Sequence, residues 1–352
     1  MHLATRLKLG RRALRHAWRS AAAFGTGRRA SAPVAVDASG ALIEVPGFGS
    51  NPGRLRMLLY APVHAPTAGA PLIVVLHGCG QSAAEFARDA GWMALAERLG
   101  VPLLLPEQRG DNNRGVCFNW FSPGDNRRSR GEALSIRQMV IEAKRRFRSN
   151  PHRIFVAGLS AGGAMAAALL AAYPEVFAGG AVVAALPVGC ASTASQALTR
   201  MADGGHAPPP GDWADQARAV GPASYAGPWP RLSIWHGMRD RTVDPGNAEN
   251  LVAQWTALHG LPASAYHNSA EPGAHRRSWG DSDNPAVECW SIEGLAHGFP
   301  IAGESGGHPS TWVQDVGVDA PAAIARFWGL ERPARALPAS LEETLVPCIP
   351  PG

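Results

Sequence analysis

The segment Val156-Ala157-Gly158-Leu159-Ser160-Ala161-Gly162-Gly163 places a G-x-S-x-G pattern between an apolar run and an alanine-rich run. Residues 153–157 are typical of a buried strand, and residues 164–170 of a packed helix. This context predicts a nucleophile elbow, a sharp strand-to-helix turn that presents a serine hydroxyl. The alternative is a chance match in a chain rich in Gly and Ala, with Ser160 only a turn residue. We expect a serine hydrolase with Ser160 as its nucleophile.

The length of the chain fits one large α/β domain or two small ones, and we predict one domain with tails. The chain has 352 residues, 46% of them hydrophobic and 17% charged, so it can bury a sizeable core. Strand-like and helix-like segments alternate from residue 54 onward, which predicts a mostly parallel sheet with helices on both faces. We predict an N-terminal arm at 1–36, a catalytic domain at 37–331 and a proline-rich tail at 332–352.

The positive charge of the chain is concentrated at its N-terminus. Residues 1–29 hold eight Lys or Arg and no acidic residue, so without them the formal net charge of +5 becomes −3. The body is therefore mildly acidic, and no nucleic-acid partner is expected. We interpret the arm as a disordered basic leader; the alternative is an interfacial helix that makes weak contact with a membrane or polymer surface.

The arm does not have the pattern of a standard signal peptide. Its longest apolar run, residues 21–24, is shorter than the apolar core of about 7–15 residues that such a signal needs. No stretch of the sequence approaches the roughly 20 apolar residues of a membrane span.

The alternating pattern predicts the order of the elements. An edge strand is expected at 54–60, and core strands are expected at 72–76, 101–105, 153–157, 180–186, 232–235 and 287–292. Helices are expected at 83–98, 132–148, 164–170, near 246 and at 321–328. The loop at 110–130 is too long for an ordinary connection, and the insert at 189–230 is expected to form a lid or pocket wall.

The five cysteines show no C-x-x-C spacing, which disfavours a thiolate metal site. Cys79 and Cys117 each follow a predicted strand and are expected near the same edge of the sheet. A disulfide between them would imply an oxidising compartment; the alternative is two buried thiols in a cytoplasmic protein. The other cysteines are Cys190, Cys289 and Cys348.

A serine nucleophile needs a base to take its proton and a carboxylate to orient that base. On this type of fold they follow in the order Ser, acid, His. Asp240 comes just after the strand at 232–235, and His297 lies in a loop of small residues after the last strand. Asp244 is the alternative acid, expected rather to cap a helix, and His275 and His308 are the alternative bases.

The oxyanion of acyl transfer needs backbone N–H donors. We expect one from Ala161, the residue after the nucleophile, and one from Cys79 in the loop after the strand at 72–76. His77, in the same loop, is expected to have a structural role.

The segment Gly78-Cys79-Gly80-Gln81-Ser82-Ala83 also matches G-x-G-x-x-A, a dinucleotide fingerprint. Glu107, near the end of the next strand, is placed where a ribose-binding acid would be. A nicotinamide-dependent oxidoreductase is therefore a remote alternative, although it leaves Ser160, Asp240 and His297 without a role. A non-catalytic binding protein with a hydrolase fold is the third class considered.

Several motifs occur together along the chain. They are Leu76-His77-Gly78-Cys79-Gly80-Gln81, Cys117-Phe118-Asn119-Trp120-Phe121, Gly158-Leu159-Ser160-Ala161-Gly162-Gly163-Ala164-Met165, Gly227-Pro228-Trp229-Pro230 before His236-Gly237, and Ala296-His297-Gly298. This combination resembles the polyhydroxybutyrate depolymerase family of esterases. The similarity runs from about residue 54 to 330.

This resemblance implies an α/β-hydrolase fold and a serine esterase that cleaves short-chain hydroxyalkanoate or related esters, with relatives among feruloyl and acetylxylan esterases. It also implies Ser160, Asp240 and His297 as the triad, the Cys79 and Ala161 amides as oxyanion donors, a Cys79–Cys117 bridge and Trp120 as a substrate-contacting aromatic. The alternative for Trp120 is a core tryptophan. No metal or organic cofactor is expected.

Two departures from the family pattern affect the expected substrate. Polymer-degrading members carry a signal peptide and a polymer-binding domain, which this sequence does not show, and Gly80 stands where many relatives have threonine. We therefore expect an esterase acting on small esters or soluble oligomers. The family resemblance and the cysteine pair imply an extracellular or periplasmic compartment, with a cytoplasmic location as the alternative.

Overall fold

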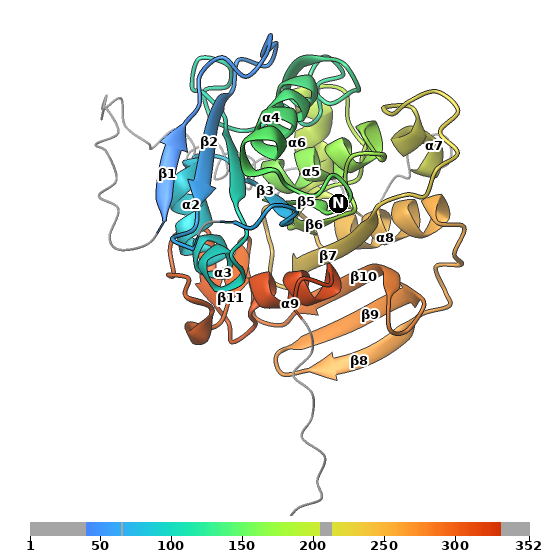
Figure 1. Cartoon of the computed structure of the whole chain (residues 1–352). Coiled ribbons are helices and arrows are strands. Elements are labelled where there is room, and N and C mark those ends of the chain that lie inside the picture. Colours follow the sequence, from blue (N-terminus) through green and yellow to red (C-terminus); the bar gives the residue numbers. More distant parts are fainter. Residues whose placement is uncertain (1–39, 65, 205–212, 332–352) are drawn as a thin grey trace, which may run out of the picture.

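A computed structural model describes residues 40–64, 66–204 and 213–331. The predicted arm at 1–36 and tail at 332–352 lie outside these residues, as does Cys348. Within them, a central sheet of ten strands has the order β1-β2-β4-β3-β5-β6-β7-β10-β9-β8 (Figure 1). In chain order the strands are β1 (Ala41–Glu44), β2 (Arg56–Ala61), β3 (Leu72–Leu76), β4 (Leu103–Glu107), β5 (Ile154–Leu159), β6 (Gly179–Val183), β7 (Arg231–Gly237), β8 (His267–Glu271), β9 (Ala274–Gly280) and β10 (Pro285–Ile292).

The middle of the sheet is parallel and its two ends are antiparallel. Strands β4, β3, β5, β6, β7 and β10 run in one direction, whereas β1–β2 and β2–β4 at one end and β10–β9 and β9–β8 at the other pair antiparallel. The carboxyl ends of the parallel strands therefore meet at one edge of the sheet, where loops from distant parts of the sequence come together.

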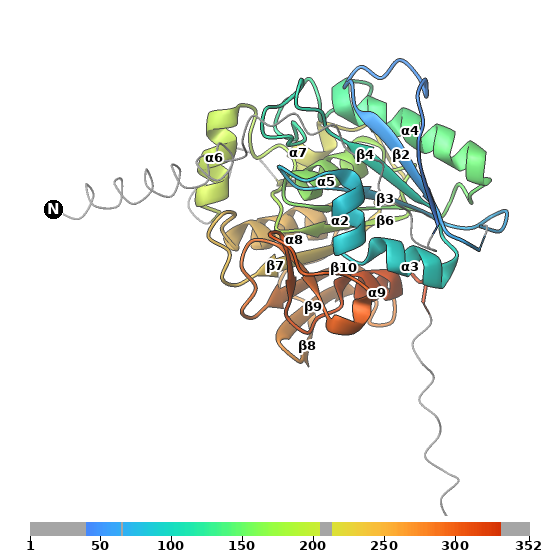
Figure 2. The ribbon, with the colours of Figure 1, turned by 90° about the vertical axis from the view of Figure 1, so that its left-hand side faces the viewer.

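Helices cover both faces of the sheet. They are α2 (Ala83–Asp89), α3 (Trp92–Leu99), α4 (Gly131–Phe147), α5 (Ala161–Ala172), α6 (Ala194–Ala202), α7 (Trp213–Arg218), α8 (Gly246–Leu258) and α9 (Ala320–Phe327). One hydrophobic core takes side chains from α4, α5, α7 and α8, and a second core takes them from α2, α3 and α9. Figures 1 and 2 show α4 on one side of the sheet and α2, α3 and α9 on the other.

Strand β3 shows how the sequence supplies both cores. Its five residues, LIVVL, are all buried. Leu72, Val74 and Leu76 belong to one core, and Ile73 and Val75 belong to the other. Successive side chains of a strand point to opposite faces, so a strand between two helical layers needs a continuous apolar run.

The mostly parallel α/β sheet predicted from the sequence is confirmed, and each of the seven expected strands has an observed counterpart. The expected edge position of the strand at 54–60 is wrong, because β1 pairs with β2 on its outer side. The expected helix at 83–98 is also divided into α2 and α3. Gly91 between them adopts a left-handed φ of 79°, a conformation that ends a helix.

Several elements were not expected from the sequence. The antiparallel strands β8 and β9 extend the sheet beyond β10. Strands β11 (Phe299–Ile301) and β12 (Val313–Asp315) form a separate parallel pair. The insert at 189–230, in which little periodicity is apparent, contains α6 and α7 on either side of the undescribed residues 205–212.

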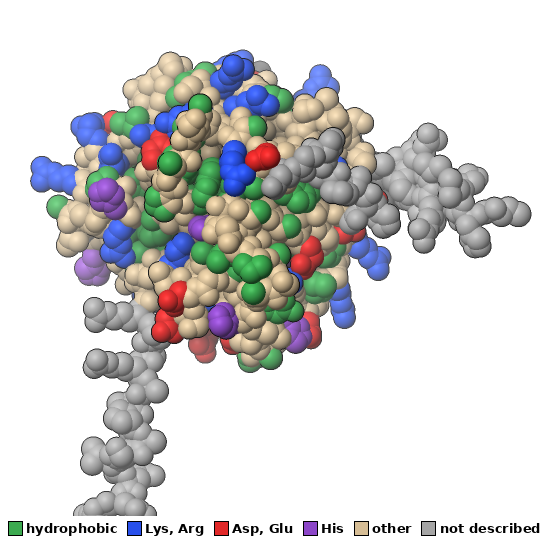
Figure 3. Space-filling model, turned by 90° about the vertical axis from the view of Figure 1, so that its right-hand side faces the viewer, with side chains coloured by type: hydrophobic (Ala, Val, Ile, Leu, Met, Phe, Trp, Pro, Cys, Tyr) green, Lys and Arg blue, Asp and Glu red, His purple; other side chains and the backbone are tan. Residues whose placement is uncertain are grey.

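The face that carries α7 and α8 has a mixed surface. Figure 3 shows Lys, Arg, Asp and Glu side chains interspersed there, with hydrophobic side chains between them. The view shows no continuous surface of one charge among the described residues of this face.

Candidate active site

Ser160 occupies the sharp turn between β5 and α5. Its backbone has φ 55° and ψ −117°, an uncommon conformation for a residue other than glycine. Glycines on both sides make the turn possible: a Cβ at Gly158 would lie 2.3 Å from the Gly162 carbonyl oxygen, and one at Gly162 would lie 2.4 Å from that of His77. The small residues of G-x-S-x-G are therefore required by close backbone approach, as in a nucleophile elbow.

The imidazole of His297 lies between Ser160 and Asp240. Its Nε2 is 3.0 Å from Ser160 Oγ, and its Nδ1 is 2.8 Å from Asp240 Oδ2. Because ionised carboxylate oxygens only accept hydrogen bonds, Nδ1 carries the proton and Nε2 is free to accept from the serine hydroxyl. The structure thus brings together residues that are far apart in the sequence: His297 follows Asp240 by 57 positions and Ser160 by 137.

Asp240 is buried, and both of its carboxylate oxygens accept hydrogen bonds. Its Oδ1 accepts hydrogen bonds from the N–H groups of Thr242 at 2.8 Å and Val243 at 2.9 Å. Burial acts to raise the pKa of Asp240, but hydrogen bonds from His236 and His297 outweigh it, so the pKa is below the ordinary value. The carboxylate is therefore ionised at neutral pH and oriented toward His297.

His236 is a contact of Asp240 to which the sequence analysis assigned no role. Its Nε2 is 3.4 Å from Asp240 Oδ2 and 3.0 Å from the Val243 carbonyl oxygen. The spacing H-G-x-x-D, which places a histidine at the end of β7 four residues before the acid, is the signal that could have found it.

Two further residues hold the loop of His297. Gln314 accepts a hydrogen bond from Ala296 N and donates one to the carbonyl oxygen of His297, both at 3.3 Å. The Trp312 ring packs edge-on against the imidazole of His297, with 5.9 Å between ring centroids. Both come from the segment around β12, which had no recognisable pattern in the sequence.

The alternative acid and bases lie elsewhere. Asp244 accepts a hydrogen bond from Gly246 N at 2.8 Å, at the first turn of α8. His275 is exposed on β9 and pairs with Glu293 at 3.3 Å, and His308 is an exposed loop residue. Among the described residues, none of these three side chains forms a hydrogen bond with the row of Ser160, His297 and Asp240.

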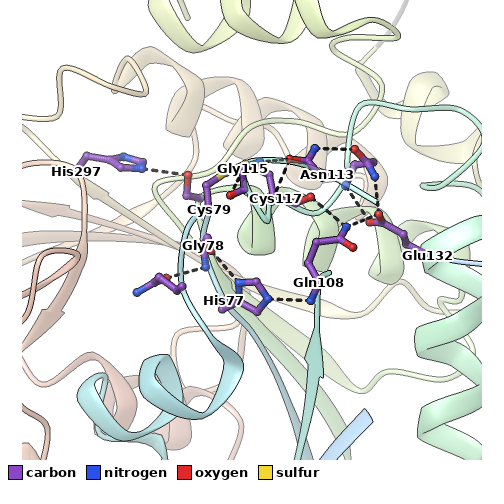
Figure 4. Close-up of a disulfide and its surroundings, with 12 residues drawn as sticks. His77, Gly78, Cys79, Gln108, Asn113, Gly115, Cys117, Glu132 and His297 are labelled. Carbon is purple, nitrogen blue, oxygen red and sulfur yellow. Dashed lines mark hydrogen bonds between the residues drawn. A yellow bond between two sulfur atoms is a disulfide. The ribbon is translucent and has the colours of Figure 1, made fainter. Parts of the chain in front are cut away.

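The two expected oxyanion donors, Cys79 and Ala161, have unused backbone N–H groups. Within the described part of the chain, neither N–H donates a hydrogen bond. Cys79 forms a disulfide with Cys117, and the adjacent Gly80 N donates to the Gly115 carbonyl oxygen at 2.8 Å. Figure 4 shows the disulfide between the loop of Cys79 and the loop of Cys117, with His297 nearby.

His77 and Glu107 are buried and form hydrogen bonds within the protein. His77 Nε2 accepts from Gln108 N at 3.1 Å, and its Nδ1 donates to the Gly78 carbonyl oxygen at 2.8 Å. Glu107 accepts from Ala83 N at the start of α2 and pairs with Arg56. The carboxylate that the dinucleotide hypothesis would use thus caps α2 and binds a guanidinium.

Trp120 and the remaining described cysteines are largely buried. Trp120 belongs to a hydrophobic core and has 8% of its surface exposed. Its ring packs edge-on against that of Phe121. Cys190 and Cys289 are free and buried, and burial raises the pKa of each thiol to about 12. These thiols are therefore protonated at neutral pH.

The described residues contain neither a cluster of metal-ligating side chains nor a membrane-spanning helix. No group of three or more His, Cys, Asp or Glu in these residues could hold a metal ion. None of the helices in the described ranges is long and apolar enough to cross a membrane.

Comparisons with known proteins agree on one family. Residues 55–275 match the family described as Esterase PHB depolymerase. The chain is 40% identical over 295 residues to the poly(3-hydroxyalkanoate) depolymerase C of Paucimonas lemoignei, covering 82% of this chain and 70% of that protein. It is 32% identical to the acetylxylan esterase of Coprinopsis cinerea, covering 75% and 71% of the two chains.

The fold has a solved counterpart. The acetyl xylan esterase from Aspergillus awamori superposes with a TM-score of 0.71 at 24% identity, covering 83% of this chain and all of that one. The esterase expectation therefore prevails over the nicotinamide-dependent oxidoreductase and the non-catalytic binding protein. The chain belongs to the Esterase PHB depolymerase family and is a carboxylic ester hydrolase with the α/β-hydrolase fold.

Proposed function

We propose that this protein hydrolyses short-chain carboxylic esters, with 3-hydroxybutyrate oligomers or polymer as its characteristic substrates. The observation that carries the proposal is the hydrogen-bonded row from Ser160 Oγ through His297 to Asp240. The 40% identity to a poly(3-hydroxyalkanoate) depolymerase supports the hydroxyalkanoate substrate class. The identities to acetylxylan esterase and to the feruloyl esterase B of Talaromyces stipitatus, 32% and 30%, support the alternative of a plant-polysaccharide ester.

The mechanism follows from the direction of the hydrogen bonds. His297 Nε2 accepts the proton of the Ser160 hydroxyl as Oγ attacks the ester carbonyl, and Asp240 stabilises the resulting imidazolium. The tetrahedral intermediate then expels the alcohol, which takes the proton from His297. Water then attacks the acyl-enzyme and gives a proton to His297. The second tetrahedral intermediate expels Ser160 Oγ, which takes that proton back, and the carboxylic acid leaves.

The oxyanion in this mechanism lies between two backbone donors. The unused N–H groups of Cys79 and Ala161 support this role, because a preorganised donor without an internal partner is available to developing negative charge. Trp120 is proposed to contact substrate through its small exposed part, next to the loop of Cys117.

The location and organisation of the chain are also proposals. The Cys79–Cys117 disulfide supports an extracellular or periplasmic location, because disulfides persist in oxidising compartments. We propose one catalytic domain over residues 37–331, with the insert at 189–230 as a wall of the substrate pocket. The two cores that share a single sheet across the described residues support one domain.

The proposal is tested by hydrolysis of p-nitrophenyl esters from acetate to long acyl chains, beside 3-hydroxybutyrate oligomers, an acetylated xylan and a feruloyl ester. Ser160→Ala is the control variant. We expect turnover that favours short acyl or hydroxybutyrate esters, and a loss of several orders of magnitude, about 10⁶-fold at most, in Ser160→Ala. Equal turnover by both proteins would contradict the assigned nucleophile, and a preference for feruloyl or xylan esters would favour the alternative substrate.

A further inference from the structure

Glu132 is a buried carboxylate outside the row of Ser160, His297 and Asp240. It lies in the first turn of α4, and 1% of its surface is exposed. Its Oε1 accepts hydrogen bonds from Gln108 Nε2 at 2.5 Å and Asn119 Nδ2 at 2.7 Å, and its Oε2 accepts from Asn119 N at 2.8 Å. Each of these donors comes from the segment 108–119, which carries Cys117.

One chain of hydrogen bonds leads from Glu132 to the residue after Cys79. Asn119, held by Glu132, accepts at Oδ1 from Asn113 Nδ2 at 2.9 Å. Asn113 Oδ1 in turn accepts from the N–H groups of Gly115 at 2.9 Å and Cys117 at 3.4 Å. The Gly115 carbonyl oxygen then accepts from Gly80 N at 2.8 Å.

A second chain leads to the residue before Cys79. Gln108, bound to Glu132, also donates from Nε2 to the Cys117 carbonyl oxygen at 3.0 Å. Its backbone N–H donates to His77 Nε2, and His77 Nδ1 donates to the Gly78 carbonyl oxygen at 2.8 Å. Figure 4 shows these groups extending from Glu132 on one side to Cys79 and His297 on the other.

The two chains therefore begin at one carboxylate and end at the two neighbours of Cys79, while the disulfide holds Cys79 itself to Cys117. We propose that Glu132 is a positioning residue of the esterase: it orders the segment 108–119 and thereby fixes the Cys79 N–H where the oxyanion forms. This inference rests on the proposed function, because the role of Cys79 as an oxyanion donor belongs to it.

The chemistry of the site requires an ionised acid. All three groups directed at Glu132 are N–H donors, and a carboxylate has only acceptor sites, so it can receive them all. A glutamine at this position would turn an N–H₂ group toward one of the donors. Burial raises the pKa of Glu132 to about 7, with a smaller contribution from nearby Asp125, whereas the hydrogen bonds from Asn119 and Gln108 lower it. Ionising this acid therefore carries a desolvation penalty that its N–H donors offset in part.

The experiment compares the wild-type protein with Glu132→Gln, Asn113→Ala and the matched control Glu142→Gln. Asn113→Ala interrupts the first chain while leaving all three hydrogen bonds of Glu132 in place. Glu142 lies on the same helix, and in the described residues its side chain forms ion pairs only with Arg145 and Arg146, so its variant controls for loss of an α4 carboxylate. For each protein, kcat and KM are measured on p-nitrophenyl butyrate, together with inhibition by a boronic acid that forms a tetrahedral adduct with serine.

We expect kcat to fall about tenfold or more in Glu132→Gln and Asn113→Ala with KM within about twofold of wild type, because a displaced oxyanion donor weakens only the transition state. The inhibition constant of the boronic acid should rise by a similar factor, since it resembles that state. Glu142→Gln should match wild type in all three quantities. Melting temperatures and titration of free thiols report whether each variant is folded with its disulfide intact.

The inference is overturned if both folded variants keep kcat and boronate affinity within twofold of wild type, or if KM rises while kcat is unchanged. If Glu132→Gln does not fold, the result for Asn113→Ala decides. Failure of the proposed function has a different signature, namely wild-type turnover no higher than that of Ser160→Ala.

Discussion

His236 Nε2 lies 3.4 Å from Asp240 Oδ2 and 3.0 Å from the carbonyl oxygen of Val243. Since both neighbours are acceptors, this nitrogen must carry the proton, and His236 donates into the turn that contains the acid. In the described structure His236 Nδ1 is buried and has no hydrogen-bond partner. One histidine thus braces the carboxylate that orients another.

Replacing His236 tests this arrangement. We expect His236→Leu to lower kcat about tenfold, because a hydrogen bond to a charged group contributes about 1.5–3 kcal/mol. His236→Gln, which retains a donor near the position of Nε2, should recover most of the lost activity. Steady-state kinetics check both variants beside His275→Leu, an exposed histidine whose loss should leave kcat unchanged. Equal kcat for His236→Leu and wild type would contradict a bracing role.

The disulfide predicts a response to reductant. Cys79 and Cys117 are separated by 38 residues, and closing a loop of that length stabilises a protein by about 4 kcal/mol in the chain-entropy description. We expect dithiothreitol to lower both the melting temperature and kcat of the wild-type protein. The double variant Cys79→Ala/Cys117→Ala should start lower and show no response. The prediction fails if wild-type thiols become titratable with no change in melting temperature.

At Gly162, helix propensity favours alanine, whereas close packing against the backbone favours glycine. Alanine is favoured over glycine within a helix by about 1 kcal/mol. A Cβ at Gly162, however, would lie 2.4 Å from the carbonyl oxygens of Leu76 and His77, both of them backbone atoms. We expect the clash to prevail and Gly162→Ala to lose about 3 kcal/mol in urea unfolding. Gly110→Ala is the control, because a Cβ there meets open space; a stable Gly162→Ala would show that the elbow can move.

The raised pKa of Glu132 predicts that the stability of the protein depends on pH. Burial raises its pKa from 4.5 to about 7, so the folded protein binds a proton more tightly than the unfolded chain does. The stabilising effect of this proton is complete below pH 4.5 and is lost as pH rises to about 7, a change of about 3 kcal/mol. Unfolding free energies between pH 4.5 and 8 should therefore fall more steeply for wild type than for Glu132→Gln. Parallel curves would contradict the raised pKa.

The sequence predicted those parts of the fold whose pattern is local. The apolar runs of β3 and β5, the G-x-S-x-G turn and the alternation of strands with helices depend on a few consecutive residues. The hairpin of β8 and β9 was missed because its exposed residues show little hydrophobic alternation. The expected edge strand was wrong because pairing of β1 with β2 depends on a neighbour and not on the strand's own residues.

The sequence by itself determined the elbow at Ser160, the order in which Asp240 and His297 follow it, and the mostly parallel sheet whose loops carry them. Tertiary structure alone decided that His297 lies 2.8 Å from Asp240 and 3.0 Å from Ser160, and that His236, Gln314 and Glu132 support the surrounding loops. The reason is physical: strand and turn preferences act between neighbours in the chain, whereas hydrogen bonds between loops depend on the register of strands that are far apart in sequence.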